Sequence, residues 1–223
     1  LLGESGFNNA AALLSDENPV ESSVVHLIAF NDIGVSRIKD KVTLQSCSVL
    51  SQFDACMSFY KKHINIGEII ETAYRRTIED VPYIAYREAV ANMLIHRDYS
   101  AESASRIEFY SDRIEIVSPG GLPLGLLREE YIEGKLSKAR NRILSDIFLR
   151  LKIIEKLATG IRRIKEQYID QDEKPKFLVS ENAVVVVLPY VMEVRKRDYD
   201  NKQIRDKSAI YGNEKLVYEL ISH

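Results

Sequence analysis

The sequence has few of the residues that form disulfides in small secreted domains or bind structural metal ions. Its 223 residues include two cysteines, four histidines and no tryptophan. Cys47 and Cys56 do not form a CxxC pair, and no cluster of histidines lies near them in the sequence. Both are therefore interpreted as buried thiols. This interpretation is favoured over a disulfide or a zinc site.

Long apolar runs are also lacking. No run approaches the roughly 20 apolar residues that a membrane-spanning helix needs. The first residues, LLGESGFNNAAALL, have neither the charged region nor the small-residue cleavage site of a signal peptide. The sequence therefore predicts no membrane partner and a cytoplasmic location.

No charge of one sign dominates. The 31 Lys and Arg residues against 33 Asp and Glu residues give a net charge of −2, without the basic excess typical of nucleic-acid binding. The locally basic stretch 195–207 also carries three aspartates, which favours a solvated linker. Direct DNA contact by these residues is therefore not expected. A hydrophobic content of 45% is enough for one main domain with smaller flanking pieces.

The first 66 residues are predicted to form a small α/β segment, after a short helix-like stretch at 8–14. The runs at 24–30 and 42–50 are rich in β-branched residues and alternate in polarity, which is typical of two strands joined as a hairpin. In the stretch 52–63 the apolar side chains recur on one helical stripe, and this favours a helix that packs against a core.

A helix with polar residues along one face is predicted within residues 81–100. Glu88 and Asn92 are four residues apart and His96 follows one turn later, so all three share a face. Such a line of polar residues is unusual on a helix that only packs, which makes this helix a candidate site. The preceding residues, 67–77, are expected to form a helix or an irregular segment.

A hairpin is predicted next, because 106–110 and 113–118 alternate in polarity around a short Ser-Asp turn. It leads into the loop 119–123, where glycines permit a backbone to approach a ligand closely. The remaining expected elements are one or two amphipathic helices from Ser137, a helix opened by Ala158-Thr159-Gly160-Ile161, and strands at 176–179 and 183–188.

These segments, in this order, resemble the motifs of the GHKL ATPases. REAVANMLIHRDYS resembles the N box (E-x-x-x-N), DRIEIVSPGGLPLGL stands in the place of the first glycine motif, and LATGIRRI resembles the second. The strings HRDYS, DRIEIVSPGGLP, ARN and ATGI-x-RI are most similar to the RecG-like C-terminal family of divergent histidine-kinase-type ATPases. The resemblance covers residues 68–189, and four ordered motifs are more specific than one glycine string.

The resemblance implies an α+β fold, in which helices cover a sheet in a GHKL-like (Bergerat) layered domain at residues 67–190. Residues 1–66 would be the small α/β segment, including the end of an upstream Schlafen/AlbA-like module and a connector. Residues 191–223 would be a linker and the start of a truncated winged-helix-like module.

The resemblance also implies roles for particular residues, with ATP and Mg²⁺ as the expected cofactors. Asn92 would be the Mg²⁺ ligand through its amide oxygen, and Glu88 would be the catalytic general base that orients the attacking water. The other nucleotide-binding residues implied are His96, Arg97, Asp98, Ser118, Gly120, Gly121, Thr159, Gly160, Ile161 and Arg162.

Two positions depart from the GHKL pattern. Ser118 or Pro119 stands where the family has the aspartate that reads the adenine amino group. The second motif has one glycine, Gly160, where several normally let the backbone wrap a triphosphate. Adenine recognition and phosphate binding are therefore expected to be weaker than in the family.

Simpler roles for the polar residues stay open at this stage. Glu88 could pair with Arg87 or Arg106, and Asn92 could cap or bridge backbone. His96 and Asp98 could form a hydrogen-bond network at the helix end, and the two glycines of the loop could serve only a tight turn.

The expected function is that of a transcriptional regulator, in which the GHKL-like domain senses an ATP-like ligand and couples to DNA through flanking modules. A homodimer is expected, because two-fold dimers are common among regulators that read paired half-sites. The sequence has no GxxxxGK[ST] string, so helicase activity is not expected. The alternatives are a Mg²⁺-dependent ATPase of weak activity and a ligand-free dimerisation scaffold.

Overall fold

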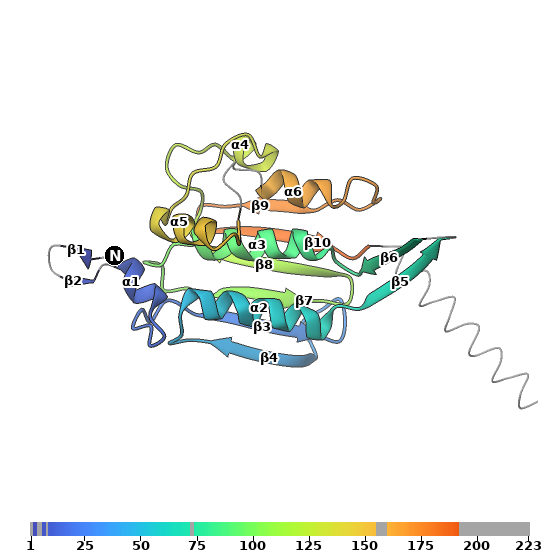
Figure 1. Ribbon diagram of the computed structural model, residues 1–223, viewed down its shortest axis with the longest axis horizontal. Coiled ribbons are helices and arrows are strands. Elements are labelled where there is room, and N and C mark those ends of the chain that lie inside the picture. Colours follow the sequence, from blue (N-terminus) through green and yellow to red (C-terminus); the bar gives the residue numbers. More distant parts are fainter. Residues whose placement is uncertain (1, 4–5, 8, 72–73, 155–159, 192–223) are drawn as a thin grey trace, which may run out of the picture.

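The computed structural model describes residues 2–3, 6–7, 9–71, 74–154 and 160–191 (Figure 1). In chain order its elements are β1 (Leu2–Gly3), β2 (Gly6–Phe7), α1 (Asn9–Leu14), β3 (Val25–Phe30), β4 (Ile38–Leu44), α2 (Val49–His63), β5 (Ile66–Glu71), β6 (Tyr74–Glu79), α3 (Tyr83–His96), β7 (Ser105–Phe109), β8 (Arg113–Pro119), α4 (Arg128–Glu133), α5 (Arg142–Arg150), α6 (Gly160–Glu166), β9 (Lys176–Val179) and β10 (Ala183–Pro189).

One mixed sheet of six strands forms the frame of the molecule. Its strand order is β4-β3-β7-β8-β10-β9. Every neighbouring pair is antiparallel except β3 and β7, which run parallel with Val25 opposite Ser105 and Ala29 opposite Phe109. The predicted hairpins β3–β4 and β7–β8 are both present, and β10 lies between β8 and β9, inside the sheet.

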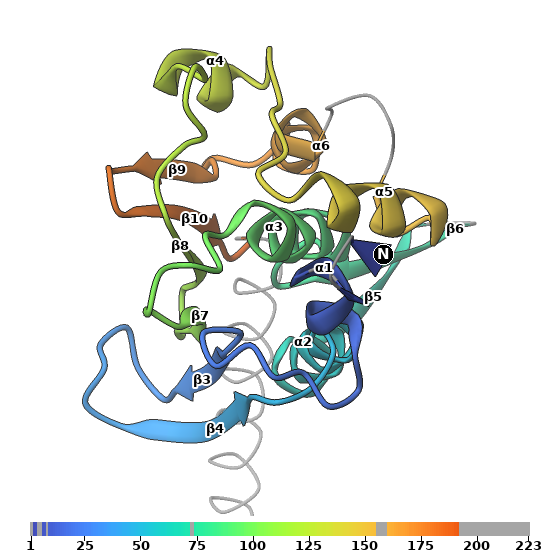
Figure 2. The same cartoon turned by 90° about the vertical axis from the view of Figure 1, so that its left-hand side faces the viewer.

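Helices α2, α3 and α5 lie on one face of this sheet (Figure 2). The strands point alternate side chains at them, as Val25, Leu27 and Ala29 of β3 show by being almost fully buried. The hydroxyl of Tyr86 on α3 donates to the carbonyl of Cys56 on α2, at 3.0 Å. This layered arrangement confirms the α+β prediction.

The segment after α2 differs from its prediction. Residues predicted as a helix or an irregular stretch at 67–77 instead form the antiparallel strands β5 and β6, paired from Ile66 opposite Glu79 to Glu71 opposite Tyr74. This hairpin extends from one end of the body (Figure 1). Hydrogen bonding between the two backbones determines the structure here. The spacing of apolar residues in so short a segment does not reveal such pairing.

Two element boundaries also differ. The strand predicted at 42–50 instead spans Ile38–Leu44, and residues 49–50 belong to α2, which Ser48 caps by accepting a hydrogen bond from the Ser51 backbone at 3.1 Å. Cys47 therefore lies in a connecting segment and not in a strand. The amphipathic helix predicted from Ser137 begins only at Arg142 and ends at Arg150, shortly before Lys152 with a φ of 59°.

Residues before position 67 belong to the same layered body as the rest. Strands β3 and β4 extend the sheet on the β7 side. Arg97, 0% exposed, follows α3 and donates hydrogen bonds to the carbonyls of Ser22, Val24 and Ser103 at 2.6, 3.0 and 3.0 Å. The small α/β segment thus supplies two strands of the six-stranded sheet, together with helices α1 and α2, to a single core.

None of the helices within the described ranges is both long and apolar enough to cross a membrane.

Candidate nucleotide-binding site

Three residues of α3 line one cavity, as their spacing predicts. Glu88, Asn92 and His96 follow one another at intervals of one helical turn, and all three border a cavity of about 330 Å³, a size in the range of small-molecule sites. Glu88 is 3% exposed, whereas Asn92 and His96 are half-buried. The cavity is therefore built around the polar face of α3.

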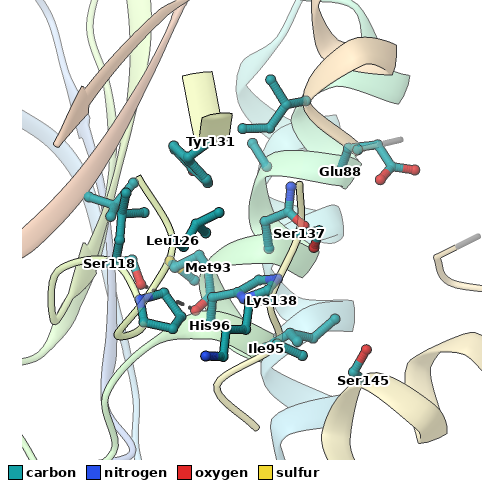
Figure 3. A pocket seen from close by; sticks show the side chains of 18 of the residues that line it. Glu88, Met93, Ile95, His96, Ser118, Leu126, Tyr131, Ser137, Lys138 and Ser145 are labelled. Carbon is teal, nitrogen blue, oxygen red and sulfur yellow. Dashed lines mark hydrogen bonds between the residues drawn. The ribbon is translucent and has the colours of Figure 1, made fainter. Parts of the chain in front are cut away.

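The other walls come from the sheet, the loop after β8 and the segment before α5. Ile116 and Ser118 of β8 and Val184 and Val186 of β10 form the floor. Figure 3 shows Glu88 and Ser118 on different sides of the pocket, with Met93 and Leu126 between them. Further lining residues are Gly120, Gly121, Leu122, Pro123, Leu126, Tyr131, Lys138, Ser145, Asp146, Gly160 and Ile161. An apolar floor with few polar groups is typical of a ligand pocket.

The glycine loop after β8 needs its glycines for two different reasons. Gly120 has a φ of +88°, and a Cβ there would lie 2.6 Å from the Cβ of Asp98. At Gly121 a Cβ would lie 2.5 Å from the carbonyl oxygen of Glu181. Side chains are therefore excluded from this part of the wall, which leaves backbone facing the pocket.

The second glycine motif comes directly against Glu88, the predicted general base, and Asn92, the predicted Mg²⁺ ligand. A Cβ on Gly160, the first residue of α6, would lie 3.0 Å from Asn92 Nδ2 and 3.2 Å from Glu88 Oε2. The fold thus brings together two motifs that are about 70 residues apart in the sequence. Thr159, also predicted to bind nucleotide, lies outside the described residues.

Glu88 is held by guanidinium groups. Its Oε1 accepts a hydrogen bond from Arg163 Nη1 at 2.9 Å, and Arg87 Nη2 lies 3.5 Å from the same oxygen. Arg106, the other partner considered from the sequence, pairs with Glu108 at 3.3 Å instead. The carboxylate is therefore neutralised by α6 as well as by its own helix.

His96 sits in the wall near Ser118. Burial, together with the nearby positive charge of Arg140, lowers the pKa of His96 to about 4, although a hydrogen bond with the Lys138 backbone acts in the opposite direction. The imidazole is therefore neutral at neutral pH, with one ring nitrogen engaged by the Lys138 backbone and the other left to bond a ligand. Ser118 also lines the cavity, and its Oγ donates to the carbonyl of Met93 at 3.4 Å.

Three predicted residues do not border the cavity. Arg97 is engaged by backbone carbonyls near β3, and Arg162 Nε donates to the carbonyl of Gly134 at 2.9 Å. Asp98 accepts hydrogen bonds from Ser100, which lower its pKa, and Arg140 lies 3.3 Å from its carboxylate. We therefore place Arg97, Asp98 and Arg162 in the frame of the site and not among its ligand contacts.

Sequence reasoning missed two residues that tie the C-terminal end of α3 to the segment before α5. Arg140 donates to the carbonyls of His96 and Gly121 at 3.2 and 2.7 Å, and Asn141 donates to those of Ile95 and Arg97 at 2.8 and 3.0 Å. The string ARN contributed to the resemblance, but its spacing carries no signal of these bonds. Such long-range contacts to the end of a helix become visible only in the fold.

A metal ion would have few protein ligands here. In the part of the chain that the structure describes, no group of three His, Cys, Asp or Glu side chains is placed to hold a metal. Asn92 lines the pocket and can supply one amide oxygen. That donor set fits Mg²⁺ bound mainly by phosphate oxygens and water, which is the usual habit of this ion.

The class of protein now follows from fold and site: an α+β layered domain of ATPase-like fold, with a pocket between one helix and the sheet. Residues 102–188 match the family described as "Putative ATP-dependent DNA helicase recG C-terminal". This match confirms the resemblance recognised in the sequence motifs. It begins after α3, so Glu88 and Asn92 precede the matched residues.

Among solved structures, the chain is similar to the DIP2311 protein from Corynebacterium diphtheriae, with a TM-score of 0.72 and 21% sequence identity. The similarity covers 85% of this chain and 39% of the corynebacterial chain, so the present chain spans well under half of that protein. At this identity the likeness supports the fold alone. No curated protein matches the chain.

Proposed function

We propose that the cavity binds an ATP-like nucleotide and that the chain is the ligand-sensing part of a transcriptional regulator. The observation that carries the proposal is the meeting of three predicted motifs around one open cavity: Glu88 and Asn92 on α3, the loop at Gly120 and Gly121, and Gly160 of α6. A pocket filled by the protein's own side chains would favour a ligand-free scaffold. The cavity of about 330 Å³ argues against that alternative.

Each side of the pocket has a task in this proposal. The floor of Ile116, Val184 and Val186 takes the apolar face of a base, with Ser118 and neutral His96 as neutral hydrogen-bonding groups at its edge. Asn92 would hold Mg²⁺, which when bound neutralises phosphate charge. Because no carboxylate replaces the missing aspartate, we expect discrimination between adenine and other bases to be modest.

The proposed regulator would act on DNA through modules that flank this domain. The balanced charge of this chain favours DNA contact through flanking modules, within the longer architecture that a 39% coverage of the corynebacterial protein suggests. We further propose that the regulator works in the cytoplasm and as a homodimer, which would place two such modules on paired half-sites.

The first test is isothermal titration of the chain with Mg²⁺-ATP and Mg²⁺-ADP. We expect binding to wild type and a loss of about tenfold or more in affinity for Asn92→Ala, because a lost charge-assisted contact costs about 1.5–3 kcal/mol. Asn31→Ala is the matched control, since Asn31 is exposed in the β3–β4 loop. Absence of binding to wild type would refute the proposal and return the ligand-free scaffold to first place.

A second candidate function is Mg²⁺-dependent ATP hydrolysis. It is favoured by one observation, the position of Glu88 one turn before Asn92 at the same cavity. Phosphate release from Mg²⁺-ATP that disappears in Glu88→Ala would support it. Binding without turnover would leave the sensing role alone.

A further inference from the structure

The carboxylate of Glu88 is turned toward α6. In Figure 3 it points away from the other labelled pocket side chains. Its Oε1 accepts the hydrogen bond from Arg163 at 2.9 Å, and the exposed fractions of the two side chains are 3% and 23%. A charge-assisted hydrogen bond of this kind is stronger than one between neutral groups, and it fixes the orientation of the carboxylate.

Arg163 lies on the same short helix as Gly160. Gly160 abuts both Asn92 and Glu88, and Arg163 follows one helical turn later, so one element supplies both contacts. Ile161 and Ile164 of α6 are buried, at 7% and 0% exposure. The position of α6 therefore fixes the guanidinium relative to Glu88, and a shift of α6 would change both contacts together.

This contact works against general-base chemistry. A general base must present a lone pair to the proton that it removes, within hydrogen-bond reach. In ATP hydrolysis a water oxygen bonds to the γ-phosphorus while the bond to the β–γ bridging oxygen breaks; Glu88 accepts the water proton, and ADP leaves with the bond's electron pair. A carboxylate oriented and stabilised by a guanidinium is a weaker acceptor for that proton.

We propose that Arg163 is a positioning residue that restrains Glu88, so that the site holds its nucleotide and turns it over slowly. This inference rests on the proposed function and on the second candidate function, because it requires that ATP enters the pocket and that Glu88 is the general base. It assigns to α6 the control of turnover: while α6 keeps Arg163 on Glu88 the nucleotide-bound state persists, and its displacement frees the base. A long-lived bound state is what a ligand-sensing module needs.

The test compares Arg163→Gln with wild type in the whole chain, by titration with Mg²⁺-ATP, thermal unfolding and phosphate release. We expect Arg163→Gln to raise kcat by about tenfold or more, within the range that general-base catalysis contributes, with KM and ATP affinity within about threefold of wild type. Arg163→Lys, which keeps the charge, should stay closer to wild type.

Two further variants make the result specific. Lys165→Gln removes a positive charge from an exposed position of α6 and should leave kcat unchanged. Arg163→Gln combined with Glu88→Gln should lose the gained turnover, because the gain acts through the Glu88 carboxylate. A gain that survives in this double variant would overturn the inference.

The inference and the proposed function fail in different ways. ATP binding to wild type with an unchanged or reduced kcat in a folded Arg163→Gln overturns the inference and leaves nucleotide binding standing. So does a loss of ATP affinity in that variant, since Arg163 would then contact the ligand. Failure of wild type to bind ATP overturns the proposed function itself, and the inference falls with it.

Discussion

His96 shows how burial sets the state of a single side chain. It occupies the pocket wall, and burial lowers its pKa to about 4 from the ordinary 6.5. The unfolded chain therefore takes up a proton near pH 6.5, whereas the folded chain resists one until about pH 4. Stability contributed by this residue is present above pH 6.5 and is lost as the pH falls from 6.5 toward 4.

We predict that the free energy of unfolding decreases by on the order of 2 kcal/mol between pH 7 and pH 5 through this residue alone. In His96→Gln that part of the decrease should be absent, as measured by urea unfolding at each pH. Burial also lowers the pKa of His26, so His26→Gln is measured beside it. Parallel pH profiles for wild type and His96→Gln would contradict the prediction.

For single residues, the sequence was informative where the spacing along one helix was enough to place them together. Glu88, Asn92 and His96 were expected to share a face, and they line one cavity. The ion pair from Arg163 to Glu88 was not expected, because it joins residues 75 positions apart. A sequence shows which groups carry charge, but only the packing of α6 on α3 shows which of them meet.

Helix α6 depends on a glycine where it meets α3. A Cβ at Gly160 would lie 3.0 Å from Asn92 Nδ2 and 3.2 Å from Glu88 Oε2, closer than such atoms normally approach. Because α6 is anchored by buried isoleucines, the strain would fall on the Asn92 and Glu88 side chains.

We therefore predict that Gly160→Ala lowers the affinity for Mg²⁺-ATP by about tenfold and lowers stability by about 1 kcal/mol. Titration and thermal unfolding measure the two effects. Gly34→Ala is the control, because no atom lies within 4 Å of a Cβ built there, and it should bind as wild type does. Equal affinity in wild type and Gly160→Ala would show that this contact is not part of the site.

Helices and strands could be predicted where the pattern of apolar and polar residues within the segment determines its structure. The alternation of β7 and β8 and the polar face of α3 gave strands and a helix close to their predicted places. The β5–β6 hairpin was missed, because its sequence has no Asn-Gly or Asp-Gly turn and its pattern resembles a short helix. The start of α2 could have been found from Ser48, a residue type favoured at the N-cap.

The order of the strands in the sheet depends on contacts throughout the molecule. Strand β3 pairs in parallel with β7, about 80 residues later in the chain. Local patterns predict each strand, but they do not say which strands become neighbours across such a distance, since that depends on the burial of all the layers together. Local patterns alone therefore predict residues 1–66 as a separate segment, although β3 and β4 belong to the same sheet as β7 to β10.

This arrangement predicts that a fragment beginning at residue 67 does not fold. It would expose the β7 edge and remove the Ser22 and Val24 carbonyls that receive the buried Arg97, leaving that guanidinium with the Ser103 carbonyl as its one remaining acceptor among these three. Circular dichroism on heating should show no cooperative transition for this fragment, while the whole chain shows one. A cooperative transition in the fragment would establish residues 67–190 as an independent domain.

The bonds of Arg97 also bear on how a signal could leave the pocket. This side chain fastens the C-terminal end of α3 to the backbone just before β3, while the same helix presents Glu88, Asn92 and His96 to the cavity. A helix moves nearly as a rigid body, so a change in its tilt at the cavity also displaces its C-terminal end. A ligand that tilts α3 would therefore displace the backbone before β3 through Arg97, without any change in the sheet.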